Sequence, residues 1–476
     1  MNTSEYSKQD GLQLSEMLRQ KAVTPLELMD CAIDRAERVD AKLNVLSYTD
    51  FDGARELART ATLKGRFSAL PLLLKDSGLG YPALLNSFGS RLMADTRINF
   101  NSTLTDRFVQ DGFIPFGRTT VPEFSMAPTT EATQNGGPTR NPWNFDRSSG
   151  GSSGGAAAAV SSGVVPIAHG SDGGGSIRIP ASCCGVFGLK PSRGLIPAGP
   201  ARGEGWGGLA TDGVLTRSVR DTAAALDGVA GMELGAPYAA PEKPESYLFQ
   251  LERPFSRPLR IAKWNAGFED IPIHPECLAA LENAGRLLEA MGHEVIDAAL
   301  PAIQFSKFVD AQINVMASNV TLSVNGKLRG SPDHDWEAKL EPAMLDAYRL
   351  GNTLSAETYA LAITRFHTIG RQLATYIQDY DFILTPTLMQ PPAQLGTISM
   401  LDDFRSYRKK ISKYTTFTAI INASGQPAAS LPLHWSPEDL PIGVQLIAPF
   451  GGEADLLRLS ASLEQSARWG ERLPDV

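Results

Sequence analysis

Cysteine and histidine are both scarce in this 476-residue chain, which has four of the first and six of the second. The cysteines, Cys31, Cys183, Cys184 and Cys277, are too few and too scattered for a disulfide framework. Neither residue type recurs at the spacing of a zinc site. We interpret the adjacent Cys183 and Cys184 as small buried residues. The sequence therefore predicts no disulfide framework, no metal and no other cofactor.

An excess of basic charge and long apolar runs are also missing. The chain has 44 lysines and arginines against 52 aspartates and glutamates, which gives a formal net charge of -8. A surface of that sign lacks the basic footprint with which proteins bind nucleic acids or anionic membranes. No stretch approaches about 18 uninterrupted apolar residues, and residues 1–20 contain no apolar signal core. We predict a cytoplasmic protein with no nucleic-acid partner and no membrane span.

What the chain does contain is enough apolar material for a large core, because 42% of its residues are hydrophobic and 20% are charged. Residues 1–65 are predicted to form an N-terminal helical segment packed on that core. Within them, Thr24-Pro25-Leu26-Glu27 places an N-cap threonine, a proline at the first helical position and a capping-box glutamate in order. Apolar residues follow at helical spacing, and no residue type in this segment points to chemistry.

Residues 66–476 are predicted to form one α/β core. Short apolar runs at 70–74, 164–167 and 186–189 alternate with turns rich in glycine and serine, which is typical of buried strands joined by tight loops. Residues 303–380 are predicted to be mainly helical and to cap the core. Further strands are expected at 259–264, 293–296, 382–384, 428–432 and 443–447, and helices at 275–291 and 454–466. Strands near both ends of the chain favour a single mixed, twisted β-sheet surrounded by helices.

The segment Gly170-Ser-Asp-Gly-Gly-Gly-Ser-Ile-Arg-Ile-Pro180 contains a candidate nucleophile. Nucleophilic catalysis needs an attacking group, a base that takes its proton, and donors for the developing oxyanion. Consecutive glycines let the backbone approach a ligand closely, and their N–H groups can converge as an anion nest. Ser176 follows directly and is placed to attack a carbonyl held there. A turn that holds a phosphate, or one with no ligand, would have the same composition.

A second glycine-rich segment, Gly150-Gly-Ser-Ser-Gly-Gly155, contains Ser152. Gly150-x-Ser152-x-Gly154 also satisfies the nucleophile-elbow pattern of α/β-hydrolases. An elbow follows a buried strand, whereas residues 141–149 are polar, and no histidine downstream lies in an evident motif. His169, in an apolar run before the other glycine loop, is interpreted as a core histidine. The elbow interpretation stays open as an alternative.

Lys75 closes the strand-like apolar run Leu72-Leu-Leu-Lys75-Asp76. A lysine there is unusual, because burial of an ammonium group is unfavourable. It can extend to the surface or pair with Asp76, or it can be a neutral base. The last role needs a pKa lowered by about 3 units, which corresponds to about 4 kcal/mol and lies within the reach of burial.

The segment Gly203-Glu-Gly205-Trp-Gly-Gly208 matches G-x-G-x-x-G by letter. The fingerprint requires a strand before it and a helix after it. Neither is predicted here, so we interpret this segment as a loop.

Taken together and in this order, the motifs resemble the amidase signature family of serine hydrolases. Asn141-Pro-Trp143, the Ser152 segment and the Ser176 segment follow in register, and the two serines are 24 positions apart, as in that family. The resemblance extends over essentially the whole chain, most clearly over residues 69–225. It continues at Gly185–Gly188, Lys190–Gly194, Thr385–Thr387, Gly425–Pro432 and Leu440–Gln445.

The resemblance implies a Ser–Ser–Lys triad. Ser176 would be the acylated nucleophile, Ser152 would relay the proton, and Lys75 would be the base. It also implies a cis peptide bond between Gly151 and Ser152. The family works through an acyl-enzyme, without metal or cofactor.

The same resemblance implies roles for residues around the triad. The backbone amides of Gly173, Gly174, Gly175 and Ser176 would form the oxyanion hole, and Met126 would line the acyl site. Ser153, Asp172 and Arg178 would support the loop by hydrogen bonds. Two residues depart from the family pattern: Ser171 stands where threonine is usual, and Gly173 where a side chain is usual.

Within the family the chain is most similar to the branch of 6-aminohexanoate cyclic-dimer hydrolases and aryl acylamidases. We therefore expect hydrolysis of small-molecule carboxamides, which include aryl, aliphatic or cyclic amides, and carbamates as in some members of that branch. The alternatives are the catalytic component of a glutamine-dependent tRNA amidotransferase, an α/β-hydrolase esterase with Ser152 as nucleophile, and a non-enzymatic nucleotide-binding module. The sequence does not determine the oligomeric state, and a homodimer is one possibility.

Overall fold

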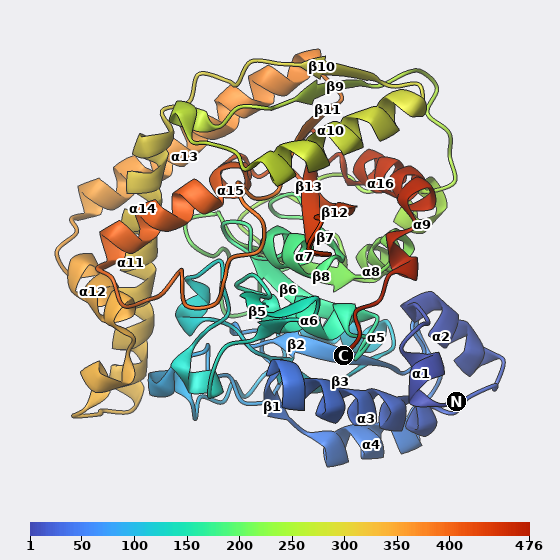
Figure 1. Cartoon of the computed structure of the whole chain (residues 1–476). Helices are drawn as coiled ribbons and strands as arrows, with labels where there is room; N and C mark the ends of the chain where they lie inside the picture. The colour runs from blue at the N-terminus through green and yellow to red at the C-terminus, as the bar shows by residue number, and fades with distance from the viewer.

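The computed structural model describes residues 1–476 and is built on one sheet of eleven strands. The sheet runs from the N-terminal helices at one end of the molecule to β9 and β10 at the other (Figure 1). Its strands, in order across the sheet, are β1 (Leu46–Thr49), β3 (Phe113–Thr119), β2 (Leu70–Lys75), β6 (Ile167–Asp172), β8 (Thr211–Thr216), β7 (Phe187–Lys190), β12 (Ala428–Trp435), β13 (Pro441–Ile447), β11 (Phe382–Pro386), β9 (Arg260–Lys263) and β10 (Glu294–Asp297). A separate hairpin pairs β4 (Arg140–Asn141) with β5 (Asn144–Ser148).

Helices surround the sheet, so the predicted α/β fold is confirmed (Figure 1). They are α1 (Thr3–Tyr6), α2 (Gly11–Arg19), α3 (Pro25–Leu43), α4 (Phe51–Thr60), α5 (Thr103–Gln110), α6 (Gly154–Ser161), α7 (Arg178–Cys184), α8 (Val219–Val229), α9 (Tyr247–Gln250), α10 (Pro275–Ala290), α11 (Phe305–Gly330), α12 (Pro342–Gly351), α13 (Ala356–Tyr376), α14 (Phe404–Tyr414), α15 (Thr416–Ser424) and α16 (Glu453–Ala467). None of them combines the length and the apolar character needed to cross a membrane.

The sheet is mixed, and its two halves meet at β12 and β13. In one half β2 is parallel to β3 and β6, and in the other β9 is parallel to β11 and β10. Between them, β12 pairs antiparallel with β7 and with β13, and β13 pairs antiparallel with β11. The strands β9, β10 and β11 therefore reach the rest of the sheet only through β12 and β13.

The N-terminal segment, expected to be helical over residues 1–65, also contains a strand. Its helices α1 to α4 are present, and α3 has the predicted capping box, in which the side chain of Thr24 accepts from the Glu27 N–H. Residues 46–49, however, form β1, which pairs antiparallel with β3 at the edge of the sheet. Helical periodicity does not extend through these four residues, and the exposed side of β3 offers them hydrogen bonds.

The region 303–380 contains α11, α12 and α13, which lie together along one side of the molecule (Figure 1). Its buried apolar side chains belong to a second core, which also contains residues of β9, β11, β12 and β13. Val315, Phe366, Met126 and Ile179 are all members of that second core. The cap helices and the signature loops therefore share one apolar interior, which places the cap beside the functional region.

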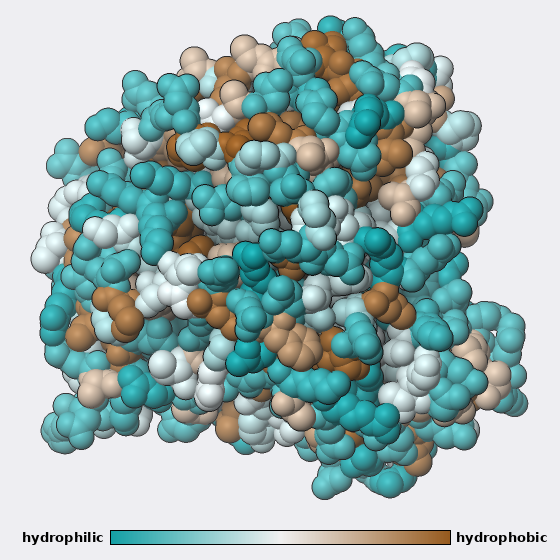
Figure 2. Space-filling model, in the orientation of Figure 1, coloured by the Kyte–Doolittle hydropathy of each residue, from teal (hydrophilic) through white to brown (hydrophobic).

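Other predicted elements differ only at their ends or in small additions. In the run 164–167 only Ile167 is part of a strand, and the expected surface crossing at 235–258 includes the short helix α9. Residues 203–208 form a loop, as predicted. The face seen in Figure 2 is mainly hydrophilic, with apolar residues in separate small groups.

Candidate active site

A pocket of about 300 Å³ lies where the two glycine-rich segments, the loop 203–208 and α11 meet. Ser152, Ser171, Gly173 and Ser176 line it, as does Met126. Segments far apart in the sequence are thus brought to one cavity, and both candidate serines face it. Its other walls include Phe88, Phe124, Trp206, Asp212 and Val320.

Lys75 closes β2, a strand in which every residue is buried. Its side chain is 0% exposed and has no carboxylate within ion-pairing distance. Nζ lies 2.8 Å from Ser152 Oγ, 3.1 Å from the Ser171 carbonyl oxygen and 2.9 Å from Ser171 Oγ. A neutral amine has two N–H groups and one lone pair. It can therefore donate to both oxygens of Ser171 and accept from the hydroxyl of Ser152.

Burial lowers the pKa of Lys75 from 10.5 to about 7. The negative charges of Asp212 and Asp172 act in the opposite direction and prevent a larger fall. Desolvation disfavours the charged form, and no counter-ion touches the amine to restore it. Burial therefore favours the neutral amine of Lys75.

Ser152 follows a cis peptide bond from Gly151, as the resemblance implies. Its hydroxyl is within hydrogen-bond distance of Lys75, whereas the hydroxyl of Ser176 has no hydrogen-bond partner within the protein. The Ser152 and Ser176 hydroxyls line one pocket but are not hydrogen-bonded to each other in this structure. Ser153 ties the two segments together, because its N–H donates to the Ser176 carbonyl oxygen (3.2 Å) and its hydroxyl to the Ser171 carbonyl oxygen (3.3 Å).

The glycine loop before Ser176 is held by Asp172. Asp172 Oδ1 accepts from the Gly175 N–H at 2.7 Å, and Oδ2 accepts from the Ile177 N–H at 3.1 Å. The Gly175 amide, expected among the oxyanion donors, is therefore occupied. The N–H groups of Gly173, Gly174 and Ser176 have no acceptor within the protein. These three remain free to bind an anionic oxygen.

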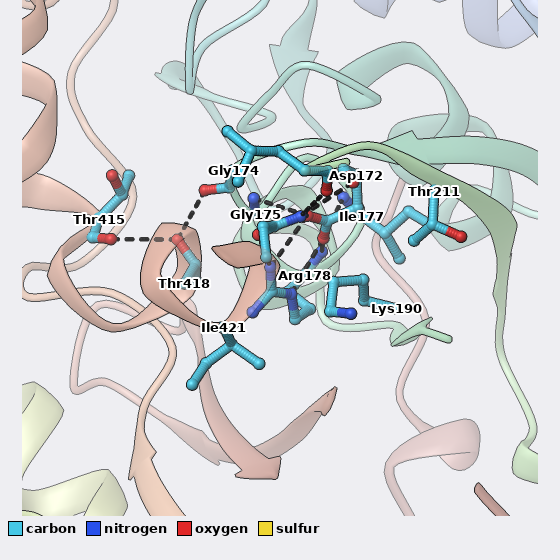
Figure 3. A network of polar contacts seen from close by, with 12 residues as sticks. Asp172, Gly174, Gly175, Ile177, Arg178, Lys190, Thr211, Thr415, Thr418 and Ile421 are labelled. Carbon is cyan, nitrogen blue, oxygen red and sulfur yellow. Dashed lines mark hydrogen bonds and ion pairs between the residues drawn. The ribbon is translucent and has the colours of Figure 1, made fainter. Parts of the chain in front are cut away.

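Arg178 forms a buried two-point ion pair with Asp172, with Nε–Oδ2 and Nη2–Oδ1 distances of 2.9 Å (Figure 3). Burial alone would raise the pKa of Asp172, but the charge and hydrogen bonds of Arg178 outweigh it and hold that pKa well below its ordinary value. Two residues from the C-terminal part of the chain complete the network. Arg178 donates to Gln445 Oε1 (2.7 Å) and to Asn422 Oδ1 (2.6 Å).

Asn422 links three parts of the site. Its Nδ2 donates to Asp172 Oδ1 (2.9 Å), to the Asp172 carbonyl oxygen (3.0 Å) and to the Leu209 carbonyl oxygen (2.9 Å). It therefore connects the nucleophile loop with the loop that carries Trp206. The sequence analysis gave no role to Asn422 or to Gln445, although Gln445 ends one of the motifs that carry the family resemblance. Nothing in their own segments indicates an ion pair about 250 residues away.

Met126 lies in a loop with unusual backbone geometry. Phe124 and Ser125, just before it, have positive φ values of 49° and 59°. The Met126 carbonyl oxygen accepts from Arg408 Nη1 (3.2 Å), and Arg408 Nη2 donates to Gln312 Oε1 (2.9 Å). The backbone of the predicted acyl-site residue is thus fixed by a buried arginine of α14, which sequence reasoning also missed.

His169 is buried next to the site but does not reach the pocket. Its Nδ1 accepts from the backbone N–H of Lys75 (3.2 Å), and its Nε2 lies 3.1 Å from Asp212 Oδ1. Burial lowers its pKa, which favours the neutral ring with the proton on Nε2. This arrangement agrees with the interpretation of His169 as a core histidine.

All four cysteines are free and buried. Burial raises the pKa of Cys183 to about 12 and that of Cys184 well above its ordinary value, so neither is an activated thiolate. No group of three or more histidine, cysteine, aspartate and glutamate side chains lies close enough to hold a metal ion.

Comparison with known proteins agrees with this geometry. A family model described as Amidase matches residues 27–457. The 6-aminohexanoate-cyclic-dimer hydrolase of Pseudomonas sp. (strain NK87) is 32% identical over 486 residues, which cover 98% of this chain and 97% of that protein. Two solved structures resemble the fold closely.

One is the 6-aminohexanoate cyclic dimer hydrolase complexed with substrate, with a TM-score of 0.93 at 31% identity over 98% of this chain and 99% of that chain. The other is a bacterial aryl acylamidase of the amidase signature family, with a TM-score of 0.89 at 26% identity over 97% of each chain. The chain therefore belongs to the amidase family, as an amide hydrolase of the amidase signature type.

Proposed function

We propose that this protein hydrolyses small-molecule amides through an acyl-enzyme on Ser176, with Ser152 relaying protons to and from Lys75. The observation that carries the proposal is the buried Lys75 amine, 2.8 Å from Ser152 Oγ, at a pocket that also exposes Ser176. Burial lowers the pKa of that amine to about 7. A base with a pKa near the working pH is neutral often enough to act and basic enough to accept a proton.

Acylation moves two protons and forms one bond. As Ser176 Oγ attacks the carbonyl carbon, its proton passes to Ser152 Oγ, and the proton of Ser152 passes to Lys75 Nζ. The carbonyl oxygen becomes an oxyanion facing the free amides of Gly173, Gly174 and Ser176. The Lys75 ammonium then returns a proton through Ser152 to the leaving nitrogen. The C–N bond breaks, the amine departs, and the acyl group remains as an ester on Ser176.

Deacylation reverses the relay with water in place of the amine. Water gives a proton through Ser152 to Lys75 as its oxygen attacks the ester carbonyl. The same free amides stabilise the second oxyanion. Collapse releases the carboxylic acid and returns the proton to Ser176 Oγ. For this relay the side chain of Ser176 must rotate to donate to Ser152 Oγ, which its unpaired hydroxyl allows.

The substrate class is a small amide: aryl, aliphatic or cyclic, with carbamates included. A pocket of about 300 Å³ suits a small molecule, and the names of the cyclic-dimer hydrolase and aryl acylamidase relatives support the same class. The alternative, the catalytic component of a tRNA amidotransferase, shares the fold, since the glutamyl-tRNA(Gln) amidotransferase chain of Thermotoga maritima has a TM-score of 0.80 at 26% identity. That function needs further protein partners and glutamine as the amide donor.

A fluorophosphonate adduct located by mass spectrometry tests the nucleophile. We expect the adduct on Ser176, its absence in Ser176→Ala, and strongly reduced labelling in Ser152→Ala and Lys75→Ala. Ser162→Ala is a matched control, because that buried hydroxyl has no partner to lose. An adduct on Ser152 in the wild type would refute the proposal in favour of the α/β-hydrolase mechanism.

A hydrolysis panel with the purified chain alone tests the substrate class. We expect turnover of an aryl amide such as 4-nitroacetanilide, and the panel should add cyclic and aliphatic amides, a carbamate and glutamine. Turnover of glutamine alone, and only with added protein partners, would favour the amidotransferase.

A further inference from the structure

The loop 203–208, whose sequence imitates a nucleotide-binding motif, forms part of the active-site wall. Trp206 lies in this loop and lines the same pocket as Ser176 and Gly173. Its side chain is half-buried and packs against the second apolar core. The mechanism proposed above does not use it.

Trp206 and the residue at position 173 compete for one volume. A methyl group added to Gly173 would lie 2.5 Å from Cε3 and 2.7 Å from Cζ3 of the Trp206 ring. Carbon atoms in real structures do not approach so closely, so a side chain at 173 and the ring at 206 cannot both occupy these positions. The indole therefore occupies the volume that a side chain at position 173 would need.

The tip of the loop is held from several sides. An isolated bridge joins Gly205 to Ala210, with an N–O distance of 3.1 Å, and closes Trp206 into a tight turn. Gly207, at φ 63°, sits so close to α13 that a Cβ there would lie 2.3 Å from Ile363 Cδ1. Arg193 Nε donates to the Gly208 carbonyl oxygen at 2.6 Å. The backbone on both sides of Trp206 is therefore held in place, and the ring packs on the second apolar core.

The position of the Trp206 ring determines which groups of a substrate it contacts. Gly173 begins the loop whose free amides face the oxyanion, so a ring packed on Gly173 borders the space next to the scissile carbonyl. An indole at this position favours flat groups, because an aromatic ring can stack on it or meet it edge to face. A puckered or branched group of the same size is thicker and must displace the ring.

We infer that Trp206 is a specificity-determining residue that selects substrates with a flat group, above all an aromatic ring, bonded to the scissile amide. The inference rests on the proposed function and deepens it, because it names the substrate class that the Ser176 site prefers. Trp206 itself takes no part in proton transfer.

Paired substrates that differ only in ring shape test the selection. On the acyl side, benzoyl and cyclohexanecarbonyl 4-nitroanilides are compared, and on the amine side, acetanilide and N-cyclohexylacetamide. We expect Trp206→Ala to reduce the flat-to-puckered ratio of kcat/KM about tenfold in the series whose ring faces the wall. Trp206→Phe, which keeps a flat ring, should retain most of the ratio. Unchanged ratios in both series would overturn the inference.

A double-mutant cycle tests the shared volume independently of substrate shape. Gly173→Ala should reduce kcat/KM in the wild type, where the methyl group meets the ring, and reduce it much less in Trp206→Ala. An equal reduction in both backgrounds would overturn the inference. Trp336→Ala is the matched control, because this half-buried cap tryptophan packs on Tyr348 and lies outside the pocket.

Labelling of Ser176 by a fluorophosphonate is measured in every variant. If Ser176 is labelled normally while the ratios and the cycle show no effect of Trp206, only this inference fails. If the wild type is not labelled at Ser176, the proposed function itself fails.

Discussion

His169 accepts a hydrogen bond from the backbone of Lys75, and its opposite ring nitrogen faces Asp212. The histidine thus fixes the main chain that carries the proposed base and touches neither substrate pocket nor amine. Asp212 anchors the ring and also adds negative charge near Lys75, which raises the pKa of that amine. The protonation of Lys75 therefore depends on Asp212, a carboxylate at the wall of the pocket.

Replacement of Asp212 by asparagine should lower the pKa of Lys75. The ammonium form loses a stabilising negative charge, so the midpoint of the rising limb of kcat/KM against pH should move to lower pH, by roughly half a unit to one unit. The measurement is a pH–rate profile on an aryl amide. Asp146→Asn, a change at an exposed residue outside the pocket, serves as control. A midpoint that moves upward would contradict the assignment of Lys75 as the base.

The pH dependence of the wild type follows from the pKa of about 7 for Lys75. Below that value the amine is protonated and cannot accept from Ser152, so kcat/KM should rise about tenfold per pH unit and level off above about pH 8. A profile that stays flat from pH 6 to pH 9 would exclude a lysine base with this pKa.

Lys75→Met should abolish activity and yet stabilise the fold at neutral pH. The unfolded chain keeps the lysine proton up to about pH 10.5, whereas the fold releases it near pH 7. The unfolded state therefore binds more protons in this window, and the lysine's contribution makes stability rise with pH across it. At pH 7 the shifted pKa of Lys75 lowers the unfolding free energy of the wild type by on the order of 4 kcal/mol. Loss of the Lys75 hydrogen bonds in the variant offsets about 1–3 kcal/mol of that gain.

Urea unfolding at pH 7 and pH 9 measures this effect. We expect the variant to be more stable than the wild type at pH 7, with the difference shrinking at pH 9. A variant less stable than the wild type at pH 7, with no change in the difference at pH 9, would mean that the lysine is not desolvated.

Asp172→Asn should destabilise the fold by about 3–5 kcal/mol, because it leaves the guanidinium of Arg178 buried without a negative partner. The pair Arg257–Asp381, whose arginine is mainly exposed, also has two hydrogen bonds, from Nη1 and Nη2, with distances of 2.8 and 2.6 Å. Asp381→Asn should therefore change the unfolding free energy by about 1 kcal/mol or less. Similar losses in both variants, measured by chemical denaturation, would contradict the role given to burial.

Glu123→Gln should remove a pH-dependent loss of stability. Burial raises the pKa of Glu123 from 4.5 to about 8, so the fold binds a proton that the unfolded chain releases, and this contribution falls as pH rises from about 4.5 to 8. Glutamine can still accept from the Glu341 N–H and donate to Ser90, the two partners of the carboxyl group. The variant should gain about 3–4 kcal/mol relative to the wild type between pH 5 and pH 8. A constant difference over that range would show that Glu123 ionises normally.

Local sequence could predict those site residues whose own short segment has a distinctive composition. Ser176 and Ser152 stand in glycine-rich turns, and Lys75 ends an apolar run, so each was a candidate on its own, and the family resemblance implied their roles. The strand β1 was not predicted, because four half-buried residues between two helices have no distinctive pattern. Asn422, Gln445 and Arg408 were not predicted either, since their contacts to the site join positions hundreds of residues apart.

The structural role of the loop with Trp206 could not be predicted from the sequence. Its sequence matches a phosphate-binding motif, and only the absence of a predicted flanking strand and helix argued against that interpretation. Its place beside Gly173 depends on contacts with α13 and Asn422 that no local pattern encodes. The unusual glycine at 173 was visible in the sequence, but its physical reason was not.

The arrangement of the sheet has a consequence for synthesis on the ribosome. All three proposed triad residues, the oxyanion loop and Arg178 have been made once residue 178 is complete, but Arg178 still lacks its partners Asn422 and Gln445. Strands β9, β10 and β11 likewise have no connection to the first half of the sheet until β12 and β13 exist. We therefore expect a nascent chain that stops at about residue 420 to hold every proposed reacting group and to be inactive, because β12 and β13 have not yet joined the two halves of the sheet.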